Sequence, residues 1–158
     1  MDVKYFIGPM SKNIVDAIVE FCNNTGNQIT FIPSRRQVEW NGGYVNNWTT
    51  EEFSKYTNLP KQRDHSGPGQ GINDDDGYES LKYDCQYLDL IHIDPWKKFS
   101  TFSDGLEWTI DMINYCYSIY PDVQFEIGTD EAIRYFEAYE LADLMHQLKQ
   151  RLLPDIYN

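Results

Sequence analysis

Apolar residues follow two kinds of spacing that alternate along the whole chain. Short apolar or extended segments, each about the length of a β-strand, are separated by longer stretches. In those stretches apolar residues recur every three or four positions, as they do on one face of a helix. The segments that predict strands are 4–8, 29–33, 60–64, 88–94 and 123–128.

Several of the helical stretches begin with a recognisable capping signal. Ser11 can cap a helix whose apolar face begins at Ile14. Thr49 and Glu52 form a capping box, which opens a short helix that reaches residue 56. The other predicted helices are 78–86, a helix that follows Gly105 and includes Tyr117, 129–136 and 140–153.

The alternation of strand and helix, repeated about five times, predicts an α/β domain with a parallel sheet and right-handed crossovers. Two architectures fit this order of elements. One is a five-stranded doubly wound sheet, and the other is a TIM-barrel-like fold or a partial barrel of (βα) repeats. A complete barrel usually needs about 250 residues. With 158 residues, taken as one domain over 1–158, length alone favours the doubly wound sheet.

The charge balance narrows the classes of partner. The chain has 25 acidic and 13 basic residues, a formal net charge of −12. Nucleic acid is not an expected partner, because neutralising phosphates needs a basic surface. An anionic membrane surface is disfavoured for the same reason, and no apolar stretch approaches the ~18 residues of a membrane helix.

Cysteine usage indicates a reducing compartment. Cys22, Cys85 and Cys116 are an odd number of cysteines, lie far apart and form no CxxC motif. Buried, reduced thiols are the simplest interpretation. The first residues also lack the long apolar run of a signal peptide. We therefore expect a cytoplasmic protein.

Two acid–histidine pairs follow predicted strands and are the strongest candidates for chemistry. Asp64 and His65 are adjacent in the segment QRDHSGPGQG, and His92 and Asp94 are two positions apart in IHIDP. In parallel α/β folds, the carboxyl ends of the strands carry the functional groups. Glu126, near the end of the fifth predicted strand, is a further candidate carboxylate. The alternative for each pair is a buried structural network.

Four motifs, in this order and at this approximate spacing, resemble one protein family. They are QVEWNGGYVNNWTTEEF (37–53), DHSGP (64–68), IHIDP (91–95) and IGTD (127–130). The chain resembles the accessory, so-called non-catalytic, subunit of class II D-tagatose-1,6-bisphosphate aldolase, over roughly residues 29–129. That family has a TIM-barrel fold related to the class II fructose-bisphosphate aldolases. The resemblance therefore favours the barrel-like architecture, with this chain as the amino-terminal part of a longer barrel.

The resemblance implies a sugar-phosphate site with a divalent metal, usually Zn²⁺, and an aldolase-type carbon–carbon lyase activity. His65 matches a zinc-ligand histidine, and Asp64 matches the neighbouring aspartate that transfers a proton. Asp94 and Glu126 are then additional catalytic carboxylates, and His92 is a substrate-binding residue. A catalytic zinc centre needs three protein ligands and an open position. Only His65 is matched to that role, so a complete aldolase site in this chain alone is not expected.

Two features of the sequence depart from the family pattern. Arg35 and Arg36 follow the second predicted strand, at the same end as Asp64, where arginine can bind a phosphate or carboxylate with two hydrogen bonds. The alternative is that both form salt bridges with the acidic loops. The segment Trp96, Lys97 and Lys98 also has no counterpart in the family.

Aromatic residues gather in the loops at the same predicted end. Trp40, Tyr44, Trp48 and Trp96 could stack on a sugar ring or pack together as a lid.

Three functions remain open at this stage. The first is an aldolase-like lyase, or a sugar-phosphate-binding relative of one. The second is a non-enzymatic subunit that stabilises a catalytic partner; an open half-barrel exposes strand edges, so a partner subunit or a homo-oligomer is expected. The third is a stand-alone flavodoxin-like binding domain.

Overall fold

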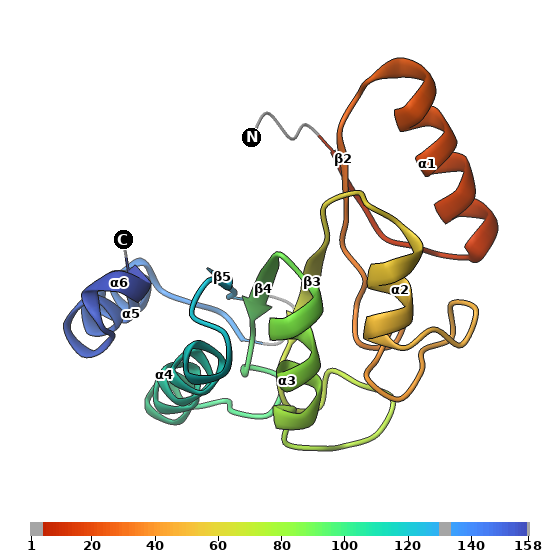
Figure 1. Ribbon diagram of the computed structural model, residues 1–158. Helices are drawn as coiled ribbons and strands as arrows, with labels where there is room; N and C mark the ends of the chain where they lie inside the picture. The colour runs from red at the N-terminus through yellow and green to blue at the C-terminus, as the bar shows by residue number, and fades with distance from the viewer. Residues whose placement is uncertain (1–4, 130–133, 158) are drawn as a thin grey trace.

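The computed structural model describes residues 5–129 and 134–157. Its five strands run parallel to their neighbours (Figure 1). β1 pairs with β2, and β3, β4 and β5 form a second sheet in that order. Single parallel bridges, from Phe31 to Lys61 and from Ser34 to Asp64, connect β2 to β3. The strands are β1 (Tyr5–Ile7), β2 (Ile29–Phe31), β3 (Gln62–Ser66), β4 (Leu90–Ile93) and β5 (Gln124–Ile127).

A helix follows each strand, and the predicted caps are present. Ser11 accepts a hydrogen bond from the backbone of Ile14, and Thr49 forms a reciprocal capping box with Glu52. These bonds satisfy backbone N–H groups that the first turn of a helix leaves without partners. The helices are α1 (Lys12–Thr25), α2 (Thr50–Tyr56), α3 (Tyr78–Tyr87), α4 (Phe102–Ile119), α5 (Ala138–Arg151) and α6 (Pro154–Tyr157).

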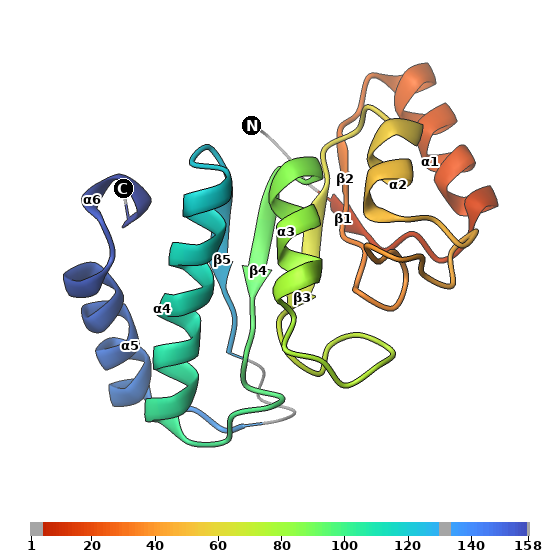
Figure 2. The ribbon, with the colours of Figure 1, turned by 60° about the horizontal axis from the view of Figure 1, so that its bottom comes forward.

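The helices lie along one side of the strand array. α3 and α4 both cover the same face of the β3–β5 sheet (Figure 2). The opposite face carries alternate strand residues that are largely polar. They include Gln62 of β3, His92 of β4, and Gln124 and Glu126 of β5. This polar, uncovered face is the one on which the candidate site is built.

The order of the strands decides between the two predicted architectures. Doubly wound sheets reverse their strand order at a switch point and have helices on both faces. Here β1 to β5 follow one another without a reversal, so the doubly wound alternative is wrong. The prediction of parallel (βα) repeats is confirmed, but the described strands do not close into a barrel.

Buried apolar side chains form two clusters, one on each side of the boundary between β2 and β3. The first lies around α1, β2 and α2 and includes Val15, Phe31 and Phe53. The second lies between the β3–β5 sheet and α3, α4 and α5, and includes Trp96 and Leu144. Cys22 belongs to the first cluster, and Cys85 and Cys116 to the second; all three are buried, free thiols.

One predicted element differs from the structure. A short helix was expected over 129–136, but residues 134–137 are not helical, and 130–133 lie outside the described residues. The last main helix begins instead at Ala138, where Glu137 and Glu140 form the capping box. Thr129 could cap a helix by its hydroxyl, but the start at Ala138 is the one that forms, with the backbone N–H of Glu137 donating to the carboxylate of Glu140 at 3.1 Å.

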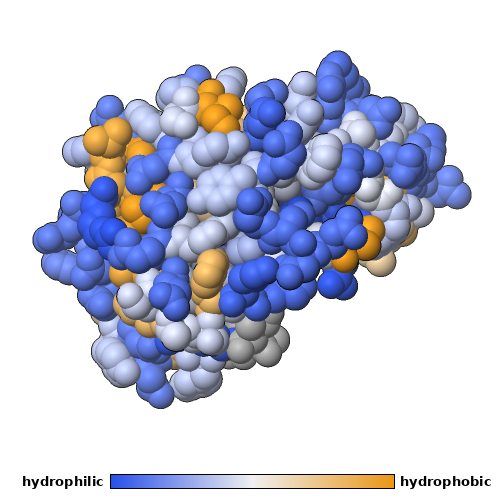
Figure 3. All heavy atoms as spheres, turned by 90° about the horizontal axis from the view of Figure 1, so that it is seen from below, coloured by the Kyte–Doolittle hydropathy of each residue, from blue (hydrophilic) through white to orange (hydrophobic). Residues whose placement is uncertain are grey.

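The face seen from below is largely hydrophilic (Figure 3). Seen from below, hydrophobic atoms gather near the side of the molecule where α5 lies (Figure 3). Leu141 and Met145 of α5 are 45% and 44% exposed. Among the described residues, no helix is both long enough and apolar enough to cross a membrane.

Candidate functional site

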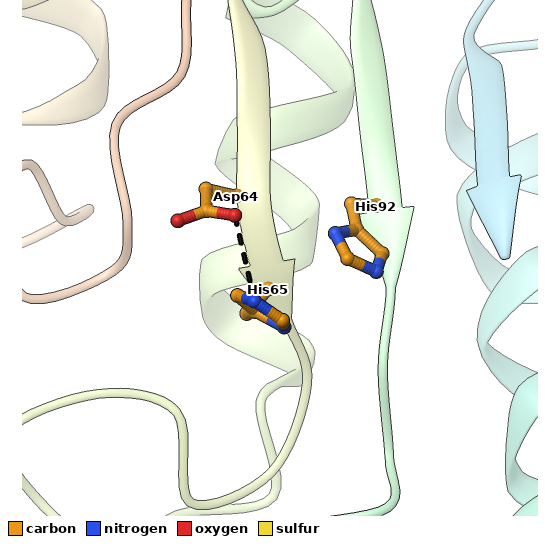
Figure 4. Close-up of side chains that lie close together, drawn as sticks. All are labelled: Asp64, His65 and His92. Atoms are coloured by element: carbon orange, nitrogen blue, oxygen red, sulfur yellow. Dashed lines mark ion pairs between the residues drawn. The ribbon is translucent and has the colours of Figure 1, made fainter. Parts of the chain in front are cut away.

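The carboxyl end of β3 departs from regular strand geometry. Its pairing with β4 shifts register between Arg63 and Ser66, which places a bulge at Asp64 and His65. His65 has a φ of +49°, in the left-handed region that non-glycine residues seldom adopt. Bulges next to functional sites change the direction in which a side chain points. Here the bulge turns two consecutive residues toward the same open side of the sheet (Figure 4).

Asp64, His65 and His92 form a compact group of potential ligands (Figure 4). Each offers one ligand atom, and these atoms all lie within 4.8 Å of one another. The Nε2 atom of His65 lies 3.6 Å from Oδ1 of Asp64. The rings of His65 and His92 are tilted at 39°, with centroids 4.6 Å apart. The two predicted acid–histidine pairs therefore meet in space across β3 and β4.

Asp94 lies behind this group and orients it. Its side chain is fully buried, and Oδ2 lies 2.6 Å from Nδ1 of His65. In this bond Nδ1 of His65 donates and the carboxylate oxygen accepts, which fixes the ring with Nε2 turned toward Asp64. The same Oδ2 accepts a hydrogen bond from Gln70 at 3.1 Å, and Oδ1 accepts one from the backbone of Trp96 at 3.2 Å. This is the arrangement by which a carboxylate orients a metal-binding histidine.

The ring of His92 lies so close to the backbone of Gly128 that any side chain there would collide with it. A Cβ atom at Gly128 would lie 1.9 Å from Nε2 of His92. That Nε2 is buried and has no hydrogen-bond partner among the described residues. Burial, followed by the nearby charge of His65, lowers the pKa of His92 below its usual value, although Glu126 and Asp94 oppose this. A neutral imidazole is the form that binds metal ions.

Glu126 lies on the same face but outside this group. It is the register partner of His92 on β5 and is exposed. Its carboxylate accepts a hydrogen bond from the side chain of Gln62. This bond joins β5 to β3 across the central strand β4. The predicted catalytic role of Glu126 stays a prediction.

The two predicted arginines have different surroundings. Arg35 is buried: its Nε donates to Glu39 at 2.6 Å, and its NH1 and NH2 groups donate to the two oxygens of Asp75 at 2.8 and 2.6 Å. NH1 also donates to the carbonyl oxygen of Gly67 at 2.7 Å. Arg36 is exposed, and its Nε makes one long bond, of 3.4 Å, to the carbonyl oxygen of Gly71. The salt-bridge alternative thus describes Arg35, whereas Arg36 has no carboxylate partner among residues 5–129 and 134–157.

Sequence reasoning did not identify two residues that complete the site. Gln70, in the glycine-rich loop after β3, holds Asp94 from the solvent side, and Gly128 makes room for His92. Both lie within segments already noted for other reasons, the loop that follows DHSGP and the IGTD motif. Gly128 directly follows β5, which lies beside β4 with His92. A glycine in that position often marks a place where another group approaches the backbone closely, and this signal was present in the sequence.

The group of Asp64, His65 and His92 fits a divalent metal by its donor set. Two imidazoles and one carboxylate are the ligands of many catalytic zinc sites, which leave a fourth position open. A buried carboxylate behind one of the histidines is the usual second partner. The described residues thus supply three ligand groups, where only one had been matched from the resemblance.

Comparison with known proteins identifies the fold and nothing finer. No protein-family model matches the sequence, and no curated protein matches it. A solved structure, the crystal structure of a probable tagatose 6 phosphate kinase from Sinorhizobium meliloti 1021, superposes with a TM-score of 0.73 over 93% of this chain, at 13% sequence identity. This chain spans only 43% of the length of that protein.

Proposed function

We propose that this chain belongs to carbohydrate metabolism and binds a sugar phosphate at the carboxyl ends of β3 and β4. In this proposal Asp64, His65 and His92 hold a divalent metal, with Zn²⁺ as the first candidate. The observation that carries it is the close grouping of the three side chains, whose ligand atoms all lie within 4.8 Å of one another, with the buried carboxylate of Asp94 bonded to Nδ1 of His65 behind them. The name of the structural neighbour and the four family-like motifs agree in pointing to tagatose phosphates.

An aldolase-type cleavage is the reaction class that the site would support. A divalent metal held by Asp64, His65 and His92 would supply the positive charge that polarises the carbonyl of a ketose phosphate. Asp64 is about a third exposed, and we propose that one of its carboxylate oxygens binds the metal while the other accepts the proton of the substrate hydroxyl as the carbon–carbon bond breaks. The electron pair of that bond passes into the carbonyl-bearing fragment. Asp94 is buried and bonded to His65, so in this scheme it positions His65 and does not touch the substrate.

The anion of the substrate needs a basic residue near this edge. Arg35 is already paired with two carboxylates, so Arg36 is the better placed of the two predicted arginines. A guanidinium with several unused N–H groups suits a phosphate, because it can donate two parallel hydrogen bonds.

The chain offers a matched control for testing the metal site. It has three histidines, and His146 lies exposed on α5, away from the other two. We expect Zn²⁺ titration by calorimetry to show one site, weakened at least about tenfold by His65→Asn or His92→Asn. His146→Asn should bind Zn²⁺ as the unmodified chain does. Equal binding by all three variants, or none by the unmodified chain, would contradict the proposal.

A second candidate function is that of a subunit that supports a catalytic partner. Two observations favour it: the open strand array matches less than half of a longer protein, and α5 leaves Leu141 and Met145 exposed. In this case a partner would complete the array as part of a larger barrel. Light scattering of the unmodified chain and of a Leu141→Glu, Met145→Glu variant tests it. Monomers in both would contradict self-association through this surface.

A further inference from the structure

A cavity of about 320 Å³ lies beside the candidate site, on the far side of the loop that follows β3. The residues that shape it come from the loop after β2 and from the loop 67–77. Its buried floor contains Arg35, Glu39 and Gly71, and its rim contains Trp40, Asn41 and Asn73. This volume is within the range of pockets that hold small molecules.

The charges on the floor do not suit an anion. Arg35 is bonded to both Glu39 and Asp75, so two carboxylates surround one guanidinium and the group carries a formal charge of about −1. Gly71 lies directly over this network: a Cβ there would be 3.1 Å from an Arg35 NH2 atom. A phosphate in the cavity would face the carboxylates together with a guanidinium that is already paired.

The rim offers neutral hydrogen-bonding groups and an aromatic ring. The side-chain amides of Asn41 and Asn73 make no hydrogen bonds within residues 5–129 and 134–157, and both residues are exposed. Each amide can both donate and accept. Trp40 is half-buried and stacks on Tyr83 with ring centroids 6.1 Å apart, which fixes the position of its indole. A hydroxyl group both donates and accepts hydrogen bonds, so an amide, which does the same, is a suitable partner. The C–H face of a sugar ring packs well on an aromatic surface.

We propose that this cavity binds an uncharged, hydroxyl-rich ring, an unphosphorylated sugar, at a site separate from the metal group. Asn41 and Asn73 hold its hydroxyls and Trp40 covers one face. The site goes beyond the proposed function, because it needs neither the metal nor a phosphate.

The cavity and the candidate metal site share one loop. Arg35 bonds the carbonyl of Gly67 and the side chain of Asp75, near the two ends of that loop. Gln70, between them, donates to Asp94, which orients His65. A sugar bound against Gly71 therefore contacts the same segment that holds Asp94.

Saturation-transfer NMR and calorimetry on the full chain test this proposal, with methyl β-D-galactopyranoside and D-fructose as neutral probes and D-fructose 6-phosphate as the charged one. We expect at least one neutral sugar to bind. The Asn41→Ala, Asn73→Ala double variant should weaken that binding by about tenfold, the effect of losing two ordinary hydrogen bonds. The matched control is Asn23→Ala, Asn24→Ala on α1, where two exposed asparagines are removed far from the cavity. It should bind as the unmodified chain does.

Asp64→Asn separates this proposal from the proposed function, since it should lose Zn²⁺ and keep the neutral sugar. No binding of either neutral probe overturns the proposal, as does equal binding by the two double variants. Preference for D-fructose 6-phosphate that depends on Asn41 and Asn73 would also overturn it, because the cavity would then be an anion subsite. Thermal unfolding of each variant establishes that a loss of binding is not a loss of fold.

Discussion

Arg63 and His65 lie two residues apart on β3, and each pairs with a buried aspartate, yet their surroundings are opposite. Arg63 is fully buried on the helix side and donates to both oxygens of Asp84, at 2.8 and 2.5 Å. His65 lies on the open side, with its side chain 37% exposed and its backbone at a positive φ. One strand thus carries a structural ion pair and a candidate functional pair.

The difference lies in the burial and the backbone geometry of each pair. Arg63 also donates to the carbonyl oxygens of Pro33 and Val38 and to the hydroxyl of Thr50, so it links the two apolar clusters. His65 uses one nitrogen to bond Asp94 and turns the other toward Asp64. A saturated, regular and buried pair supports the fold, whereas a strained pair at the surface is typical of sites that act on a ligand.

The largest expected effect is on the structural pair. Arg63→Met removes the partner of a fully buried aspartate, so we expect the free energy of unfolding to fall by about 3–5 kcal/mol. Urea denaturation followed by circular dichroism measures it. An Arg63→Met, Asp84→Leu double variant should recover much of the loss, because neither charge is then left alone. If the double variant were as unstable as the single one, Arg63 would act through its contacts with the loops and not through Asp84.

A smaller effect is expected where Gly128 meets His92. Gly128→Ala places a methyl group where Nε2 of His92 now lies, and overpacking of this kind costs about 1–3 kcal/mol. Zn²⁺ binding should weaken with it, because His92 must move. Gly128→Ala combined with His92→Ala should regain stability but not Zn²⁺ binding. No change in either measurement for Gly128→Ala would show that His92 is free to leave this position.

A third ion pair, Arg35 with Asp75, should make the stability of the fold depend on pH in acid. The hydrogen bond from Arg35 is the main cause that lowers the pKa of Asp75 below its ordinary value of 3.8. The folded state therefore holds that proton less tightly than the unfolded state. The stability that results is present in full above about pH 4 and is lost as the pH falls through the folded pKa. Thermal unfolding of Asp75→Asn between pH 3 and 6 should show a weaker acid dependence. Asp122→Asn, which removes an exposed carboxylate outside this pair, is the control for the loss of one negative charge.

The smallest effect on stability is expected at the site itself. Asp64 is about a third exposed, so Asp64→Asn should change the free energy of unfolding by less than about 0.5 kcal/mol. Its effect on Zn²⁺ affinity should be large by comparison. A large loss of stability with unaltered Zn²⁺ binding would reverse the assignment, making Asp64 structural.

Apolar runs and periodicity were sufficient to predict β1, β2, β4, β5 and most of the helices, since burial of one face shapes those patterns directly. β3 was expected at 60–64 and lies at Gln62–Ser66. Periodicity could not predict that Arg63 points into the core. In QRDHS no residue is apolar, so the alternation that reveals the buried face of a strand is missing. The bulge at His65 was equally invisible, because it depends on how β3 meets β4. Arg35 and Arg36 are adjacent, and only the acidic loop that folds over them decides which one is buried.

The division of the interior into two clusters also has a consequence for the order in which the chain folds during its synthesis. The buried residues of the first cluster all precede position 54, and those of the second all follow position 80. Each cluster draws its buried residues from a separate stretch of the chain, and such segments tend to fold as units in the order in which they emerge from the ribosome. The first cluster can therefore form while the ribosome is still translating β4. Arg63 emerges between the two, and its ion pair closes only when Asp84 of α3 arrives.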